Sequence, residues 1–254
     1  MRLGIIGCGA IGTDVAKAAD TMKEIEKIYL FDINEAASKK LCSQLKKATI
    51  KPVFKFLYDV DVVFEAASQQ AVTQYAATVL EAEKDLIIMS IGSLFDDTLR
   101  EKLETIARER HRKIYLPSGA VCGIDGVLAA SVEKLDSVTL VTTKPPASLG
   151  KSVEDRTIVF EGTARQAVKL YPKNINVAAC LSIAGVGFDE TKVEIVADPV
   201  ETRISHKILA HGRFGRLRAE VENMPNPNNP QSSYMASLSA IATLRRVLNP
   251  IQIA

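Results

Sequence analysis

Residues 2–12, RLGIIGCGAIG, decide the fold of this chain. A short apolar run leads into a turn in which Gly7, Gly9 and Gly12 form the pattern G-x-G-x-x-G. The pattern is weak evidence alone, but here it follows a predicted strand and opens a predicted helix, which is typical of dinucleotide binding. The first glycine allows a tight turn, the second lets the backbone approach a pyrophosphate, and the third lets helix and strand pack together.

The start of that helix supplies the groups that would contact the phosphates. Backbone N–H groups at Ala10 and Ile11 lie in the first turn, where the helix dipole favours negative charge. Asp32 ends the second predicted strand, twenty residues after Gly12, where a carboxylate can accept hydrogen bonds from ribose hydroxyls. It would repel a 2′-phosphate, so the sequence favours NAD, although Asp32 alone leaves NADP open. The alternative is a glycine-rich turn that binds no ligand.

Short apolar runs alternate with helical stretches through the first 117 residues. The predicted strands are apolar throughout, as burial on both faces of a sheet requires, and comprise residues 2–6, 27–31, 60–65, 86–89 and 113–116. The predicted helices between them comprise residues 14–22, 35–46, 70–81 and 96–110. This order predicts an α/β fold, a Rossmann-type doubly wound parallel sheet. Small residues in the turns at 65–68 and 90–93 would leave room for a nicotinamide, and tight turn packing explains them equally well.

The pattern changes at Pro117, where a glycine-rich stretch leads into longer, more alternating strands. These are residues 137–144, 157–161, 192–197, 201–210 and 215–222, with helices at 163–170 and 176–184. They predict a second, α+β domain on a mostly antiparallel sheet. Residues 223–233 are rich in proline and asparagine and predict a loop. We expect a dinucleotide-binding domain at 1–117, joined by a C-terminal helix within 231–248, and a substrate and dimerisation domain at 118–230.

Composition excludes several classes of protein. The 254 residues have a formal charge of +2 and are 47% hydrophobic, which is ordinary for a globular protein. No apolar run is long enough to span a bilayer, and no basic cluster predicts nucleic-acid binding. The four cysteines form no CxxC pair and have no zinc-finger spacing, so we expect no metal site. The N-terminal apolar stretch is interrupted by glycines, unlike a signal peptide, so we expect a cytoplasmic protein.

The three histidines are the natural candidates for proton transfer near neutral pH. His111 lies in the charged stretch RERHRK and is expected to be a solvated surface residue. His206 shares one strand face with Ile204 and Ile208, whereas His211 falls on the other face or in a turn. A histidine among apolar neighbours is usually a structural residue, so either one remains a candidate at this point.

An asparagine-rich junction, YPKNINV at residues 171–177, joins two predicted helices. Lys173, Asn174 and Asn176 lie near the start of the second helix. An asparagine there can cap the helix. It can equally bind a cofactor carboxamide or a substrate carboxylate.

At four places the sequence resembles the L-aspartate dehydrogenase family. The matching segments are PSGAVCGIDG (117–126), YPKNINVAA (171–179), ISHKILAHGRFG (204–215) and ENMPNPNNPQSSYMASLSAIATLRR (222–246). With the glycine-rich turn they extend over nearly the whole chain. Four separate segments in the same order are more specific than the turn alone.

The resemblance implies oxidation of L-aspartate to iminoaspartate with NAD or NADP, after which water releases ammonia and gives oxaloacetate. Iminoaspartate can also supply NAD biosynthesis. The family is a homodimer, and its proposed catalytic histidine matches His206. Its cofactor contacts match Ala120 and Asn176. Because aspartate has two carboxylates, Lys173 and Asn174 are our candidates for binding them.

Two alternatives remain at this stage. Dihydrodipicolinate reductase, homoserine dehydrogenase and inositol dehydrogenases share the same two-domain plan, and fold alone does not choose among them. A nicotinamide-binding sensor without catalysis would keep the glycine-rich turn and Asp32 but would need no base at His206.

Overall fold

The computed structural model describes residues 1–171 and 176–251, and the side chains of Pro230 and Gln231 are not described. The chain divides into two compact units. The first contains Met1–Pro117 and the C-terminal segment that starts at Ser237, and the second contains Ser118–Ala236. Each unit is described below by itself.

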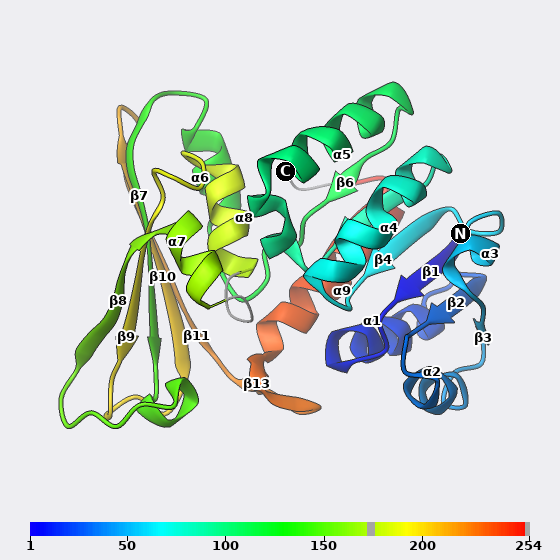
Figure 1. Cartoon of the computed structure of the whole chain (residues 1–254), viewed down its shortest axis with the longest axis horizontal. Helices are drawn as coiled ribbons and strands as arrows, with labels where there is room; N and C mark the ends of the chain where they lie inside the picture. The colour runs from blue at the N-terminus through cyan, green and yellow to red at the C-terminus, as the bar shows by residue number, and fades with distance from the viewer. Residues whose placement is uncertain (172–175, 252–254) are drawn as a thin grey trace. The chain divides into compact units, whose positions relative to one another are not determined.

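A six-stranded parallel sheet forms the centre of the first unit, in the order β3-β2-β1-β4-β5-β6 (Figure 1). Its strands are β1 (Arg2–Ile6), β2 (Lys27–Phe31), β3 (Ala48–Ile50), β4 (Val62–Glu65), β5 (Asp85–Ile88) and β6 (Ile114–Tyr115). This is the doubly wound strand order typical of dinucleotide-binding domains. The predicted parallel sheet is therefore confirmed. Leu3 and Ile5 of β1 are fully buried, as expected for a central strand covered on both faces.

Helices cover this sheet and complete its core. They are α1 (Ala10–Thr21), α2 (Glu35–Cys42), α3 (Val53–Phe56), α4 (Gln69–Glu81), the 3-10 helix η1 (Ile91–Phe95), α5 (Asp97–Glu109) and α9 (Tyr234–Leu248). Side-chain caps start several of them, such as Ser68 Oγ, which accepts from Ala71 N at 3.1 Å. Ala240 and Leu244 of α9 are fully buried in the same apolar core as β1 and β2. The last helix thus belongs to the first sheet.

The second unit is built on a five-stranded sheet in the order β11-β10-β7-β9-β8, in which only β7 and β9 pair in parallel. Its strands are β7 (Leu135–Lys144), β8 (Thr157–Thr163), β9 (Lys192–Ala197), β10 (Ile204–Gly212) and β11 (Gly215–Asn223). Along one face lie α6 (Ile124–Ala130), α7 (Ala164–Leu170) and α8 (Asn176–Ala184), and the 3-10 helix η2 (Pro146–Leu149) follows β7 (Figure 1). The mostly antiparallel sheet of the prediction is confirmed.

Several elements differ from the sequence prediction. The predicted loop at residues 223–233 contains a short hairpin of β12 (Pro225–Asn226) and β13 (Asn229–Ser233), so a loop over this whole range is wrong. The final helix, Tyr234–Leu248, lies within the predicted range 231–248. The first helix begins directly at Ala10 rather than at residue 14. β3, α3 and α6 were not predicted, because each is short and lies beside proline or glycine.

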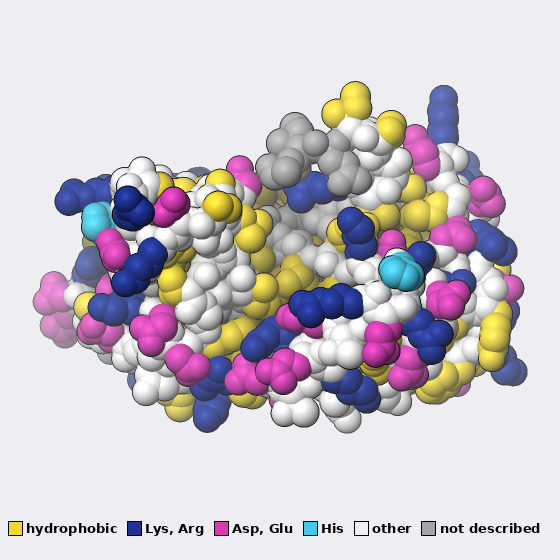
Figure 2. All heavy atoms as spheres, turned by 90° about the horizontal axis from the view of Figure 1, so that it is seen from above, with side chains coloured by type: hydrophobic (Ala, Val, Ile, Leu, Met, Phe, Trp, Pro, Cys, Tyr) yellow, Lys and Arg dark blue, Asp and Glu magenta, His cyan; other side chains and the backbone are white. Residues whose placement is uncertain are grey.

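Charged side chains of both signs are interspersed over the face shown in Figure 2. No helix in the described part of the chain has the length and apolar character needed to cross a membrane. Among the same residues, no three histidine, cysteine or acidic side chains gather as metal ligands would.

Candidate active site

The glycine-rich turn adopts the geometry that its sequence predicts. Gly7 has a φ of 101°, a conformation that L-residues with side chains rarely adopt. Its N–H donates to the Phe31 carbonyl at 2.8 Å, which ties the turn to the end of β2. A Cβ atom on Gly12 would overlap the carbonyl oxygen of Gly7. Gly7 is therefore required by its backbone conformation, and Gly12 by the close approach of the helix to the turn.

Gly9 differs, because a Cβ atom there would meet no protein atom within 4 Å. It is the N-cap of α1, and its carbonyl accepts the first intrahelical hydrogen bond, from Thr13 N at 2.8 Å. The N–H groups of Ala10, Ile11 and Gly12 precede that bond and have no intrahelical acceptor. An open cradle at a helix N-terminus fits the pyrophosphate of a dinucleotide.

Asp32 directly follows β2, and backbone donors hold its carboxylate. Oδ2 accepts from Cys8 N at 2.7 Å and Oδ1 accepts from Asn34 N at 2.8 Å. The carboxylate also lines a pocket of about 130 Å³ together with Phe31, Tyr75 and other residues of the first unit. None of the described residues that line this pocket is lysine or arginine. The pocket lies beside the end of β2, where this fold places the adenosine end of a dinucleotide.

Glu65, at the end of β4, is an organising residue that the sequence analysis missed. Its side chain is 2% exposed and accepts from Ala67 N at 2.7 Å, Ser68 N at 2.9 Å and both the N–H and hydroxyl of Ser90, at 3.0 and 2.9 Å. Burial raises the pKa of Glu65, although these hydrogen bonds oppose the shift. One carboxylate thus joins the turns after β4 and β5, which the sequence had placed at the ligand-binding edge of the sheet.

In the second unit, His206 lies on the buried face of β10 and is 6% exposed. The antiparallel register pairs it with Thr142 of β7, whose Oγ1 lies 2.9 Å from Nδ1. Burial lowers the pKa of His206 to about 3, and the positive charge of Lys144 adds to the effect. The imidazole is therefore neutral in the free protein. Nε2 has no hydrogen-bond partner among the described residues, which leaves it available to a ligand.

His211 lies on the opposite face of β10 and is exposed. Its Nδ1 lies 3.2 Å from a carboxylate oxygen of Asp136, in a solvent-exposed pair. The geometry distinguishes the two candidate histidines, because His206 alone has the buried surroundings typical of a reactive group.

Ala120 and Asn176 lie on two segments that approach each other in the second unit. A Cβ atom on Gly119 would be 3.7 Å from Cγ2 of Val177, the second residue of α8. The carbonyl of Ala120 accepts from Nδ2 of Asn223 at 3.1 Å, and Asn176 begins α8. The other two candidates in this region, Lys173 and Asn174, lie outside the described residues.

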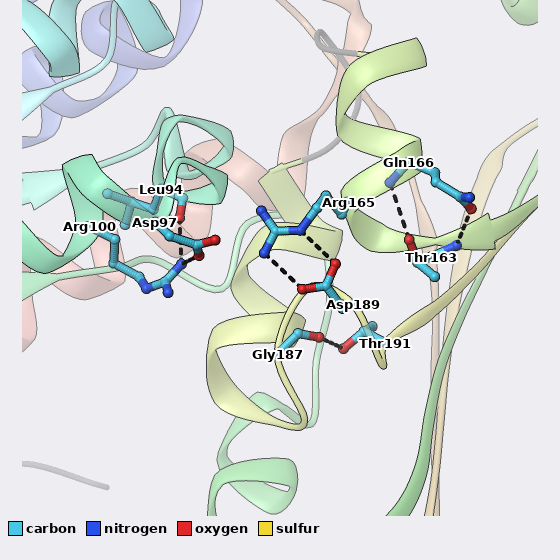
Figure 3. Close-up of polar contacts among 9 residues, drawn as sticks. All are labelled: Leu94, Asp97, Arg100, Thr163, Arg165, Gln166, Gly187, Asp189 and Thr191. Atoms are coloured by element: carbon cyan, nitrogen blue, oxygen red, sulfur yellow. Dashed lines mark hydrogen bonds and ion pairs between the residues drawn. The ribbon is translucent and has the colours of Figure 1, made fainter.

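Side-chain contacts fix the helix that precedes this junction (Figure 3). Thr163 and Gln166 form a capping box at the start of α7. Arg165 donates from Nε and Nη2 to the two carboxylate oxygens of Asp189, at 2.6 and 2.9 Å, which ties α7 to the loop before β9. Bidentate pairs of this kind fix orientation as well as position. At the other end of α7, the Tyr171 ring packs edge-on against Phe160 of β8, with ring centroids 5.6 Å apart.

Acid should destabilise the protein through His206. Because the pKa of His206 falls from 6.5 to about 3 on folding, the unfolded chain binds a proton in this interval that the folded chain does not. Stability is then lost as the pH falls below 6.5, by up to about 1.4 kcal/mol per pH unit from this residue. Scanning calorimetry at pH 7 and pH 5 measures this loss as a fall in melting temperature. We expect the fall to be smaller in His206→Asn than in the wild type. His111→Asn, which removes an exposed histidine, is the control and should behave as the wild type. A melting temperature that falls equally in His206→Asn and the wild type would contradict the prediction.

The fold and the glycine-rich turn define a two-domain oxidoreductase that binds a nicotinamide dinucleotide. Residues 7–117 match the family model described as the NAD-binding domain of homoserine dehydrogenase, and residues 125–247 match that of the aspartate dehydrogenase C-terminal domain. An L-aspartate dehydrogenase of Methanosarcina barkeri is 42% identical, over 100% of this chain and 99% of the relative. The chain belongs to the L-aspartate dehydrogenase family.

Solved structures agree with this assignment. The aspartate dehydrogenase of Thermotoga maritima is 31% identical with a TM-score of 0.84, covering 100% of this chain and 99% of the other. A putative myo-inositol dehydrogenase of Sinorhizobium meliloti is 13% identical with a TM-score of 0.59, covering 100% of this chain and 91% of the other. The latter likeness shows the shared fold alone.

Proposed function

We propose that this protein oxidises L-aspartate to iminoaspartate, using NAD, and that water then releases ammonia to give oxaloacetate. The match to L-aspartate dehydrogenases along the whole chain carries the proposal. The site supports it, because the first unit offers an open phosphate cradle at Gly9 and a ribose acceptor at Asp32, and the second offers a buried histidine. Iminoaspartate formed in this way would also be a precursor for NAD biosynthesis.

The first unit would hold the cofactor and fix its orientation. The N–H groups of Ala10, Ile11 and Gly12 would bind the pyrophosphate, and Asp32 would bind the adenosine ribose. Ala120 and Asn176 are the proposed contacts from the second unit, with the Asn176 amide suited to a carboxamide. When bound, the nicotinamide ring accepts the hydride that leaves Cα of aspartate.

His206 would handle the protons of the reaction. The amine of aspartate must be neutral, so that its lone pair forms the C=N bond as the hydride leaves Cα. A water molecule then adds to the imine carbon, and Nε2 of His206 would accept the proton that this water loses. This role requires the tautomer in which the proton lies on Nδ1 and is donated to Oγ1 of Thr142. Return of the proton to nitrogen would allow ammonia to leave.

The direct test is to mix the purified protein with NAD and L-aspartate at alkaline pH and to follow the absorbance of the reduced nicotinamide. D-aspartate, L-glutamate and L-homoserine serve as controls. Reduction with L-aspartate alone is the expected result. Reduction with another member of the panel would indicate a different two-domain dehydrogenase. NAD binding without reduction by any of the four would favour a nicotinamide-binding sensor.

Asp32 is the proposed determinant of cofactor preference. We expect Asp32→Ala to weaken NAD binding and to narrow the preference for NAD over NADP, because the variant loses the ribose acceptor and the charge that would repel a 2′-phosphate. The measurement is kcat/KM for both cofactors at saturating L-aspartate. An unchanged ratio of the two values would remove Asp32 from this role.

We also propose a homodimer. One face of the second sheet carries α6–α8, whereas Leu209 on the opposite face of β10 is 38% exposed. That face also carries charged side chains, among them the Lys207–Glu220 pair, so the proposal of a homodimer rests on the family resemblance. Light scattering should then give twice the chain mass of 27.6 kDa.

A further inference from the structure

Lys144, the last residue of β7, is a buried lysine on the same sheet face as His206. Only 7% of it is exposed. Side chains two residues apart on a strand share a face, so Lys144 lies on the face of Thr142, which contacts His206. Across the sheet, the register pairs Lys144 with Ala197 of β9.

No acidic residue among those that the structure describes neutralises this buried amine. In the described part of the chain no carboxylate lies within 4.0 Å of Nζ, and Nζ donates no hydrogen bond. Burial alone lowers the pKa of Lys144. Lys207 on the opposite face of the same sheet provides the contrast, since its Nζ lies 3.0 Å from a carboxylate oxygen of Glu220. A buried cation without a counter-charge is unfavourable, and such groups occur where a ligand supplies the missing charge.

The surroundings of Lys144 form a small pocket in the second unit. Leu140, Leu149 and Ile195 give it apolar walls, and Tyr171 lies at its edge, where α7 ends. Lys144 is the only charged side chain among the described residues that line it. The pocket has a volume of about 10 Å³, which is room for one water-sized group, such as one oxygen of a carboxylate. One cation within apolar walls is suited to a negatively charged oxygen there, because the low local dielectric strengthens the attraction.

We propose that the ammonium group of Lys144 binds a carboxylate of the substrate. The inference rests on the proposed function, since it assigns to this lysine one of the two carboxylates of L-aspartate. The substrate thereby supplies the counter-charge that the fold omits, and it is held beside Thr142 and His206. Lys144 acts here as a specificity-determining residue, with no part in the proton transfer itself.

The test compares Lys144→Met with Lys192→Met, an exposed lysine on β9 of the same sheet. Lys144→Gln serves as a second variant should the methionine fold poorly. Succinate, an unreactive dicarboxylate, is titrated into each protein by calorimetry in the presence of NADH. KM and kcat for L-aspartate are measured in parallel, and melting temperatures establish that each variant is folded.

We expect the Lys144 variants to bind succinate 10- to 100-fold more weakly, on the order of one lost charge-assisted hydrogen bond. KM for L-aspartate should rise by a similar factor with NADH affinity unchanged, and the melting temperature should stay the same or rise, because an unpaired buried charge is removed. Lys192→Met should match the wild type. L-2-aminobutyrate distinguishes the two carboxylates: an equal loss of kcat/KM for both substrates assigns the α-carboxylate, and a loss for L-aspartate alone assigns the β-carboxylate.

Wild-type succinate affinity and KM in folded Lys144 variants would overturn the inference while leaving the proposed function intact. Failure of the proposed function can be told apart from failure of the Lys144 assignment. If the wild type does not oxidise L-aspartate, the oxidation assay alone rejects the proposed function. Loss of succinate binding in the variants would then still assign a carboxylate site to Lys144.

Discussion

Replacement of His206 by alanine is expected to lower kcat for L-aspartate oxidation by about 10²- to 10⁴-fold, the usual contribution of a positioned general base. NAD affinity should change little, because the phosphate cradle and Asp32 lie in the first unit, away from β10 in the chain. The measurement is steady-state turnover together with NADH binding by fluorescence. The large effect follows from the loss of the only histidine that is buried among the described residues.

His211→Ala is the matched control, since it removes a histidine from the same strand but from its exposed face. It should retain wild-type turnover. Normal turnover in His206→Ala would exclude His206 as the base. A loss confined to His211→Ala would transfer the role to that residue.

Substitution of Gly9 by aspartate should abolish cofactor binding without unfolding the protein. A Cβ atom at this position meets no protein atom within 4 Å, and its φ of −71° is accessible to any residue. Aspartate is also a favourable N-cap and complements the helix dipole. The new carboxylate would lie where the pyrophosphate must bind. Because repulsion between like charges costs several kcal/mol, NAD affinity should fall by about 100-fold or more.

Titration calorimetry with NADH and thermal unfolding measure the two effects separately. Gly12→Ala provides the opposite case, because its new Cβ would overlap the Gly7 carbonyl and should lower the melting temperature. Retention of NADH affinity in Gly9→Asp would mean that the pyrophosphate does not bind at the start of α1.

The first unit was largely predictable, because its fold depends on local patterns. Apolar runs, the glycine turn and Asp32 lie in a fixed spacing that the sequence displays directly. β3 and α3 were missed because they have only three and four residues and are separated only by Lys51 and Pro52. The hairpin of β12 and β13 was missed because asparagine and proline indicate a turn but not the short strand pairing around it.

Tertiary burial determines the residues that the sequence analysis missed. Glu65 and Lys144 occupy strand ends, where charged residues usually reach solvent, and nothing in their neighbours along the chain distinguishes them. Glu65 is identified only by the donors that converge on it from separate turns. Lys144 is identified only by a sheet register that sets it near His206. His206 itself was open between alternatives until the family resemblance and then the burial of β10 favoured it.

The return of α9 to the first sheet has a consequence for how the chain folds during synthesis. Ala240 and Leu244 complete a core that begins with Leu3 and Ile5. Domains generally form as units while the ribosome advances from the N-terminus. Here the core of the first unit remains incomplete until the second unit and α9 have been synthesised. The apolar surface that α9 covers therefore stays exposed on the nascent sheet. Ribosome-bound chains ending near Pro117 should therefore be protease-sensitive, and chaperones that shield apolar strands should matter most before α9 has left the exit tunnel.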